Sequence, residues 1–317
     1  ATINALMENK NPRAIQPLIN KLFNSSGNSK IIDQITKALS KLGTNEMTQL
    51  YIDALHSKKQ YVKFAITKSA IDAPASFWSE KVIIEAANDE EPEIKSMALF
   101  ALKRTGSKGS VSTIIESLND YDSSVRLSAI RSLSSLPEAS NYKNKFVETF
   151  NDEDFKVRIA AVKSLANVKA DWVMEVLEDV VENNPDENMA MTAITAMSES
   201  PDKNSAVPFL GKIARSDNAN LSYTACNALV NIDNTLVRKE LIKNLKTPSN
   251  NVKINTLIAL ERLGDSSAIG AIQRLKDDPD PKVQKQAMQT LHVLSLKKSI
   301  RKTKKYKYAQ KDFSKEE

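Results

Sequence analysis

Glycine, cysteine, histidine and aromatic residues are all scarce in this chain. Glycine contributes only 7 of 317 residues and aromatic residues 6 %, which argues against a β-sandwich or a glycine-rich nucleotide-binding fold. Cys226 is the one cysteine, so an internal disulfide is excluded. No apolar run approaches the roughly 18 residues that a membrane span needs. Apolar content is ordinary at 41 %, and a folded protein is therefore expected.

Groups that carry out metal or nucleophilic chemistry are equally few. His56 and His292 are the two histidines, and no His-Glu pair or H-x-x-x-H spacing accompanies them, so we expect no metal site. Cys226 has no histidine near it in the sequence to activate its thiol, and we interpret it as a core residue. A glycine-rich phosphate-binding loop is also missing. The sequence predicts no cofactor and no enzyme.

Two other features have both a structural and a functional interpretation. Trp78 and Trp172 each lie near the start of a predicted helix, where packing is favoured over a ligand pocket. The acidic run at 175–188 is interpreted as a solvated helix face, with a docking patch for a basic partner as the alternative.

Charge is unevenly distributed along the chain. The formal net charge is +6, and residues 297–317 alone hold nine Lys/Arg and three Asp/Glu. The remaining chain is therefore neutral, and the basic character describes an appended tail rather than the folded surface. We divide the chain into a repeat region, 1–296, and a basic, flexible C-terminal tail, 297–317.

An apolar pattern recurs every 31 or 32 residues within the repeat region. Counting its first residue as offset 0, apolar or small residues recur at offsets +4, +8 and +11, and offset +7 is always Ala, Ser or Thr. These offsets share one face of an α-helix, and the small residues permit close approach by a neighbouring helix. The pattern begins at nine positions: Ile31, Val62, Ile94, Val125, Val157, Met189, Leu221, Val252 and Val283.

A second amphipathic segment precedes each of these, for example at 13–22, 110–118, 171–181 and 268–275. We call the preceding segment the A helix and the segment with the nine-fold pattern the B helix. No such pair can bury its apolar face alone, so the pairs must stack on one another. The predicted fold is all-α, a right-handed α-α superhelix of about nine two-helix repeats with a truncated first unit.

The signature D-x-x-x-x-V-R/K-x-x-A resembles the HEAT-repeat family in its short bacterial form, which phycobilin lyases share. It occurs around Ile94, Val125 and Val157, and the opening NPRAIQPLINKL is similar to that family's first helix. The resemblance implies a structural ladder, in which Arg126 is expected to pair with Asp120 of its own signature. Ala190 and Ser222 replace the basic residue, so we expect an interruption there. The ladder residues are Asp89, Lys95, Asp120, Arg126, Asp152 and Arg158.

The start of the chain falls inside a repeat. Projecting the pattern backwards places Ile3 and Leu6 in a B helix whose beginning is missing. We therefore expect the natural protein to extend further toward its N-terminus.

B helices line the concave face in this family, and helical geometry points offsets +3, +6 and +10 away from the core. In the first five repeats, offsets +6 and +10 form what we call the basic stripe, which Asp72 alone opposes. The last four repeats are neutral at these offsets. A solvated face of good helix formers is the alternative interpretation. The stripe comprises Lys37, Lys41, Lys68, Arg104, Arg131 and Lys163, with Phe100 as an apolar spot.

The tail mixes basic and aromatic groups that can bind nucleic-acid phosphates and bases, or anionic lipid. A solvated disordered tail is the alternative. The residues concerned are Lys297, Lys298, Arg301, Lys302, Lys304, Lys305, Tyr306, Lys307 and Tyr308.

The favoured function is a non-catalytic scaffold or adaptor that holds an acidic partner protein on the concave face, as a monomer or in a hetero-complex. A nucleic-acid-binding module that uses the stripe and the tail is the alternative, and a HEAT-like enzyme of the glycosylase or lyase type is third. A cytoplasmic location is slightly favoured over an exported or periplasmic one.

Overall fold

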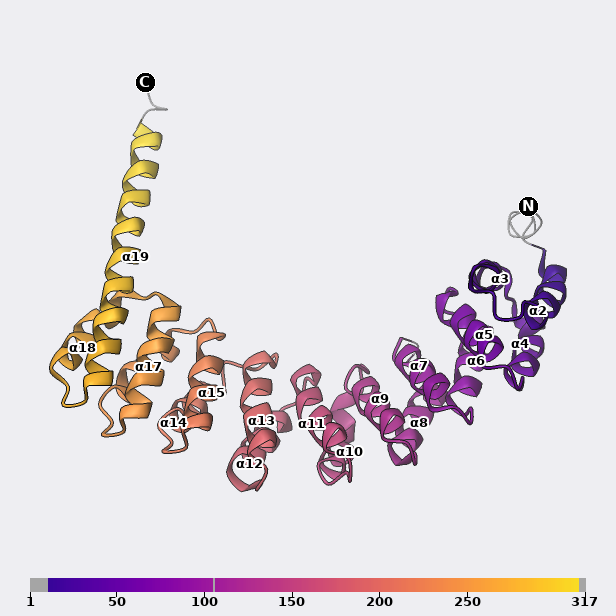
Figure 1. The fold of residues 1–317 in the computed structure, drawn as a ribbon, viewed down its shortest axis with the longest axis horizontal. Helices are drawn as coiled ribbons and strands as arrows, with labels where there is room; N and C mark the ends of the chain where they lie inside the picture. Colours follow the sequence, from indigo (N-terminus) through magenta and orange to yellow (C-terminus); the bar gives the residue numbers. More distant parts are fainter. Residues whose placement is uncertain (1–10, 105, 314–317) are drawn as a thin grey trace. The chain divides into compact units, whose positions relative to one another are not determined.

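The computed structural model describes residues 11–104 and 106–313, with side chains through Lys297 and at Ser299. Within these residues every regular element is a helix and there is no β-strand, which confirms the all-α prediction (Figure 1). The predicted B helix around Ile3 and Leu6 lies outside the described residues.

The predicted A and B helices alternate along the described chain and form nine pairs. The A helices are α2 (Ile15–Phe23), α4 (Thr48–Leu55), α6 (Phe77–Ala87), α8 (Lys108–Glu116), α10 (Lys143–Thr149), α12 (Trp172–Asn183), α14 (Val207–Ile213), α16 (Thr235–Asn244) and α18 (Ile269–Gln273). The B helices are α3 (Ser29–Leu42), α5 (Gln60–Asp72), α7 (Pro92–Leu102), α9 (Ser123–Leu133), α11 (Phe155–Ser164), α13 (Glu187–Glu199), α15 (Ala219–Val230), α17 (Asn250–Leu263) and α19 (Pro281–Phe313).

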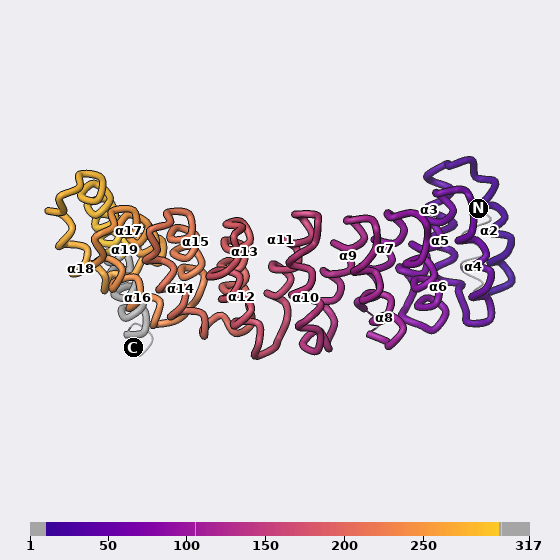
Figure 2. The backbone as a smooth tube through the Cα atoms, turned by 90° about the horizontal axis from the view of Figure 1, so that it is seen from below, coloured from indigo at the N-terminus to yellow at the C-terminus, as the bar shows by residue number. Residues whose placement is uncertain are grey.

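The chain divides into two compact halves, Ala1–Ser164 and Leu165–Glu317. The N-terminal half holds α2 to α11 and the C-terminal half holds α12 to α19. Within each half the A helices form one layer and the B helices another, as Figure 2 shows. In the N-terminal half the B helices lie on the inner side of that half's own curve (Figure 1).

Recurrent Asp and Asn residues three positions before offset 0 set where many B helices begin. Asn28 accepts a hydrogen bond from the Ile31 amide, and Asp122 accepts one from the Ser124 amide. Asp186 and Asn218 cap α13 and α15 in the same way. These side chains satisfy amides that a helix start leaves without an intrahelical partner.

The core follows the predicted offsets. Residues at offsets +4, +7 and +8 are buried in all nine B helices, and those at offset 0 are buried in seven, Ile31 and Leu221 being half-buried. One part of the geometric expectation was wrong. At offset +3 only Gln34 is exposed, while Ala65 and Ala160 are buried and the equivalent residues of the other six B helices are half-buried. Neighbouring B helices in the stack cover that side of each helix.

Trp78 is a packing residue, as the sequence indicated. Its ring lies 4.8 Å from the ring of Tyr51, and its own side chain is buried. A Cβ atom added to Gly43 would overlap the Trp78 ring. Gly43 therefore provides the space that the indole fills between one repeat and the next.

The helix α19 extends past the predicted start of the tail at residue 297. Its backbone is helical from Pro281 to Phe313, although the tail sequence lacks an apolar helical pattern. Most side chains beyond Lys297 lie outside the described part of the structure, so the proposed role of the tail stays a prediction. No helix of the described chain is long and apolar enough to cross a membrane.

Candidate partner-binding surface

Buried ion pairs connect the turns of successive repeats. The Lys63 Nζ atom lies 2.9 Å from Asp89, the Lys95 Nζ atom 2.6 Å from Asp120, and the Arg126 Nε atom 2.8 Å from Asp152. In each pair the cation is at offset +1 of one B helix and the carboxylate precedes the next B helix. A fourth pair of the same kind joins Lys253 and Asp278 at 2.7 Å in the C-terminal half.

The predicted pairing of Arg126 with the Asp120 carboxylate was wrong. Arg126 donates from Nη1 to the backbone carbonyl of Asp120 at 2.8 Å, while its Nε and Nη2 atoms bind the Asp152 carboxylate. The Asp120 carboxylate binds Lys95 of the preceding repeat. The ladder does join one repeat to the next, but each carboxylate belongs to the cation of the repeat before it.

Each ladder carboxylate also shapes its own turn. Asp89, Asp120, Asp152 and Asp278 each accept a hydrogen bond from the backbone amide two residues later, at 2.8 to 3.0 Å. Burial alone raises the pKa of Asp152, but the hydrogen bonds and charge of Arg126 outweigh it and hold that pKa below its usual value. The hydrogen bond from Lys253 likewise lowers the pKa of Asp278.

The ladder is interrupted in the C-terminal half, as the sequence indicated. Ala190 and Ser216 occupy the two positions of one missing pair, and Ser222 and Thr247 those of the next. The Ser222 hydroxyl instead donates to the Ala214 carbonyl at 2.9 Å. Both members of each missing pair are uncharged, so no lone charge is left buried at these turns.

Arg158 keeps the cation of a ladder residue. Its Nη1 atom donates to the carbonyls of Asp152 and Glu153 at 2.8 and 3.2 Å. The sequence has Asn184 where the ladder carboxylate of the next repeat would stand. Arg158 therefore binds the carbonyls of its own turn but has no ladder carboxylate in the next repeat.

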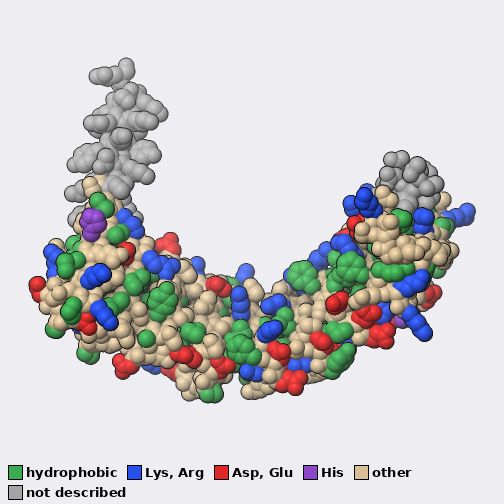
Figure 3. All heavy atoms as spheres, viewed as in Figure 1, with side chains coloured by type: hydrophobic (Ala, Val, Ile, Leu, Met, Phe, Trp, Pro, Cys, Tyr) green, Lys and Arg blue, Asp and Glu red, His purple; other side chains and the backbone are tan. Residues whose placement is uncertain are grey.

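The basic stripe lies on the B-helix layer of the N-terminal half. Lys37, Lys41, Arg131 and Lys163 are exposed, and among the described residues none of the four forms an ion pair. By contrast, the ladder cations Lys63, Lys95, Arg126 and Lys253 each pair with a carboxylate of the next repeat and are largely buried. Figure 3 shows basic and hydrophobic side chains next to one another on the inner side of this half.

Three stripe members have local partners. Lys68 lies 3.2 Å from Asp72 one helical turn away, with both side chains about half exposed. Arg104 donates from Nη2 to the Ile71 carbonyl of the preceding repeat at 2.8 Å. Phe100 is 63 % exposed, and the Lys103 Nζ atom lies 3.7 Å from the centre of its ring, a cation–π contact.

An apolar row at offset +2 was missed by the sequence reasoning, which considered offsets +3, +6 and +10. In the N-terminal half it includes Phe64, which is 47 % exposed, and the half-buried Leu127 and Ile159, whereas Asp33 and Ser96 occupy offset +2 on α3 and α7. Offset +2 precedes +6 by about one helical turn, so this row runs beside the stripe. The signal was present in the sequence, because apolar residues stood at an offset that the core pattern does not use.

The B helices of the C-terminal half carry uncharged residues at offset +6. Thr195, Asn227, Ile258 and Gln289 occupy offset +6. Arg262 donates to Asn227 of the preceding repeat, so its charge is used within the scaffold. Tyr223 at offset +2 is 49 % exposed. The two halves therefore present different chemistry on equivalent helices.

Cys226 and His56 carry side chains that catalytic sites often use. Cys226 is buried, and burial raises the pKa of its thiol to about 12 against the lowering effect of Thr256. His56 lies at the end of α4 and contacts Glu85 at 3.2 Å on the surface. No group of three or more metal-binding side chains occurs in the described part of the chain.

The acidic run follows α12 on the surface. Glu175, Asp179 and Glu182 are exposed, and Glu182 pairs with Lys212 of α14 at 2.7 Å. Partial burial raises the pKa of Glu178, and the charge of Glu182 adds to this effect while Lys212 opposes it. The pair of Glu182 with Lys212 joins two successive A helices.

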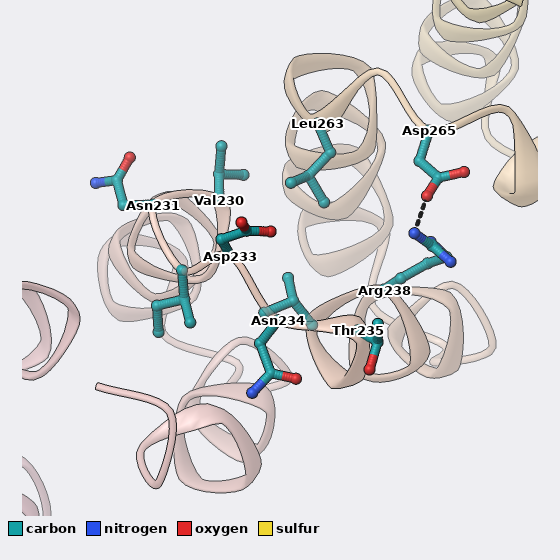
Figure 4. A pocket seen from close by; sticks show the side chains of 10 residues that line it. Val230, Asn231, Asp233, Asn234, Thr235, Arg238, Leu263 and Asp265 are labelled. Atoms are coloured by element: carbon teal, nitrogen blue, oxygen red, sulfur yellow. Dashed lines mark ion pairs between the residues drawn. The ribbon is translucent and has the colours of Figure 1, made fainter. Parts of the chain in front are cut away.

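A cavity of about 300 Å³ opens beside the turn between α15 and α16. Figure 4 shows Arg238 pointing to Asp265 across its rim, where the two side chains form an ion pair. Asp233 and Asn234 also line it. These side chains come from two successive repeats, and the charge of Arg238 is neutralised there, so the cavity contains no free cation for an anionic ligand.

Comparison with known proteins places this architecture in context. The HEAT-repeat family model matches residues 80–143, 144–230 and 207–292. No curated protein matches the sequence significantly. Among solved structures, Kap121p has 14 % sequence identity and a TM-score of 0.55, with 89 % of this chain and 37 % of that chain covered.

Two further solved structures share 12 % and 13 % sequence identity with this chain. Kap95p, whose structure describes its binding to RanGDP, has 12 % identity and a TM-score of 0.53, with 91 % of this chain and 46 % of that chain covered. Human deoxyhypusine hydroxylase has 13 % identity over 79 % of this chain and 96 % of that chain, but its TM-score is 0.34, which is too low to support an argument. The chain spans less than half the length of the two Kap proteins.

The similarity to the Kap proteins shows a shared helical-repeat fold and nothing about activity. The family model, in contrast, matches well over half of the chain in three successive segments. The matched segments contain the paired helices and ion pairs between successive repeats described above. The chain belongs to the HEAT-repeat family.

Proposed function

We propose that this protein is a non-catalytic scaffold that holds an acidic protein partner against the B-helix layer of its N-terminal half. The basic stripe and the neighbouring apolar row form the contact surface. The partner contributes carboxylates that meet the stripe and apolar side chains that meet Phe64 and Phe100.

The observation that carries this proposal is the contrast between two sets of cations. Lys63, Lys95 and Arg126 are paired with carboxylates of the next repeat. Lys37, Arg131 and Lys163 are exposed and have no carboxylate partner among the described residues. Cations that the fold does not use are free to attract an acidic surface and to select against a basic one.

Exposed apolar residues favour a protein partner over a nucleic acid. Phe64 and Phe100 are large and exposed. Lys103 contacts the Phe100 ring, and Lys68 lies one helical turn from Phe64. Protein interfaces use this mixture of aromatic and cationic side chains as anchors. Leu127 and Ile159 extend the apolar row with aliphatic groups. Aliphatic side chains offer no stacking surface for bases.

Charge reversal at the stripe tests the proposal. A variant with Lys68→Glu, Arg131→Glu and Lys163→Glu is expected to lose its partner in affinity purification from the native host, with mass spectrometry as the readout. The matched control reverses three exposed lysines of the A-helix layer, Lys21, Lys81 and Lys108, and so has the same net charge. Equal capture by both variants would contradict the proposal.

Binding to random DNA or RNA is the competing outcome. Two results would favour the nucleic-acid alternative. The dissociation constant for random sequences would rise steeply with salt. The charge-reversed variant would lose bound nucleic acid while it kept its protein partners.

A further inference from the structure

The five B helices of the N-terminal half present one side chain each at offset +6. In chain order these are Lys37 on α3, Lys68 on α5, Phe100 on α7, Arg131 on α9 and Lys163 on α11. The row therefore reads cation, cation, aromatic, cation, cation. It is symmetric in residue chemistry about Phe100.

The spacing of this row is set by helix packing. Successive helices in a packed layer lie about 8–10 Å apart. A polyproline II segment makes one turn in three residues and rises about 9 Å per turn, because each residue advances about 3.1 Å. Every third side chain of such a segment points the same way, at the spacing of the row.

Other backbone conformations fit the row less well. A β-strand alternates its side chains between two faces, so residues three apart point in opposite directions. An α-helix advances about 1.5 Å per residue and needs six or seven residues to reach the next repeat. A polyproline II segment presents one contact to each repeat without a gap.

The apolar row supplies a second line of contact. Phe64, Leu127 and Ile159 lie one helical turn from offset +6 on their own helices. A polyproline II segment has three faces. When one face points at the stripe, a neighbouring face points at the apolar row.

The geometry points to a specific partner: a linear polyproline II segment of a protein, with an acidic residue at every third position and an apolar residue at the central one. In one-letter form the recognised pattern is E-x-x-E-x-x-Φ-x-x-E-x-x-E, where Φ is aromatic or aliphatic and contacts Phe100. This inference rests on the proposed function and names the partner's binding motif. Charge complementarity to four free or weakly paired cations selects this occupant over a basic or neutral segment.

A synthetic peptide tests the motif on the 317-residue chain. The probe is fluorescein-labelled EPLEPLFPLEPLE, and binding is followed by fluorescence anisotropy. A peptide of the same composition, with glutamates placed two and four residues apart, serves as the spacing control. We expect the regular peptide to bind about tenfold more tightly than the control, which corresponds to about 1.4 kcal/mol.

Single substitutions assign the contacts. Arg131→Gln and Lys163→Gln are each expected to weaken binding about two- to fivefold, as for exposed ion pairs. Phe100→Ser is expected to weaken it about tenfold, as for a central interface anchor. Lys285→Gln is the matched control, since Lys285 is an exposed lysine on α19 in the C-terminal half. It should leave the affinity unchanged.

Each outcome decides the inference. Equal affinity for the regular and irregular peptides, or equal effects of Arg131→Gln and Lys285→Gln, overturns it. Tighter binding of single-stranded RNA than of the regular peptide at physiological salt also overturns it. If the reversed stripe loses a native protein partner while the peptide shows no spacing preference, the motif is wrong and the proposed function stands. The singly substituted residues Phe100, Arg131, Lys163 and Lys285 are all exposed, and an unchanged melting temperature confirms folding.

Discussion

The guanidinium of Arg126 binds both oxygens of the Asp152 carboxylate, at 2.8 Å from Nε and 2.9 Å from Nη2. The two residues belong to successive repeats, and both side chains are largely buried. Nη1 holds two carbonyls of its own turn at the same time. One side chain therefore fixes a turn and joins it to the next.

Loss of either partner should destabilise the N-terminal half. Asp152→Ala leaves a buried guanidinium without its carboxylate and a turn amide without its acceptor, and we expect a cost of about 3–5 kcal/mol. Glu153→Gln is the control, because Glu153 contacts the same guanidinium but is exposed. It should cost less than about 1 kcal/mol. Urea denaturation measures both values, and similar losses for the two variants would show that the ladder does not stabilise the fold.

A missing ladder pair can be rebuilt in the C-terminal half. Ala190 and Ser216 occupy the cation and carboxylate positions, and the Ser216 hydroxyl already accepts from the Asn218 amide, as the ladder carboxylates do from theirs. Ala190→Lys and Ser216→Asp are each expected to destabilise when made alone, because each buries a lone charge. The double variant is expected to be about 1–3 kcal/mol more stable than the sum of the two single losses in unfolding free energy would give. A double-mutant cycle measures the coupling, and simple additivity would mean that the pair does not form.

Acid should weaken the fold through the ladder carboxylates. The folded-state pKa values of Asp152 and Asp278 are lowered, below the value of about 3.9 for an unfolded aspartate. Their stabilisation is therefore complete above about pH 5, and is lost as the pH falls through the folded pKa values. We expect the free energy of unfolding to fall below about pH 4, and less steeply in Asp278→Asn. An unchanged slope in that variant would contradict this assignment.

The thiol of Cys226 should be unreactive in the folded protein. Burial raises its pKa to about 12, so the thiolate fraction at pH 8 is negligible and reagents cannot reach the sulfur. We expect no modification by a thiol-reactive disulfide reagent in buffer, and full modification in denaturant. Rapid modification under native conditions would contradict this expectation and would indicate an accessible, reactive thiol.

Much of the fold could be predicted from sequence, because burial repeats at fixed offsets. The regular steps from Ile31 to Val283 predicted all nine B helices, and recurrent Asp and Asn caps set where many of them begin. The ladder was predicted less completely. A cation and its carboxylate lie in different repeats, so a motif read within one repeat misses Lys63 and Lys253, whose own repeats have Ser57 and Thr247 at the carboxylate position. It also misassigns the partner of Arg126.

The candidate surface was predicted in part. Exposure of Arg131 and Lys163 follows from helical geometry alone, because offset +6 is opposite the core. The half-buried state of offset +3 and the exposure of Phe64 depend on how neighbouring B helices cover one another. The sequence of a single helix does not specify how closely its neighbours pack against it.

Site-specific photo-crosslinking tests the central claim most directly. Benzoylphenylalanine at Ser135, an exposed residue at offset +10 beside the stripe, is compared with the same group at Ser112, which is exposed on the A helix of the same repeat. The account predicts a crosslinked protein partner from position 135 that disappears when Lys68, Arg131 and Lys163 are reversed to Glu, and none from position 112. A partner captured from position 112 and not from position 135 would contradict it.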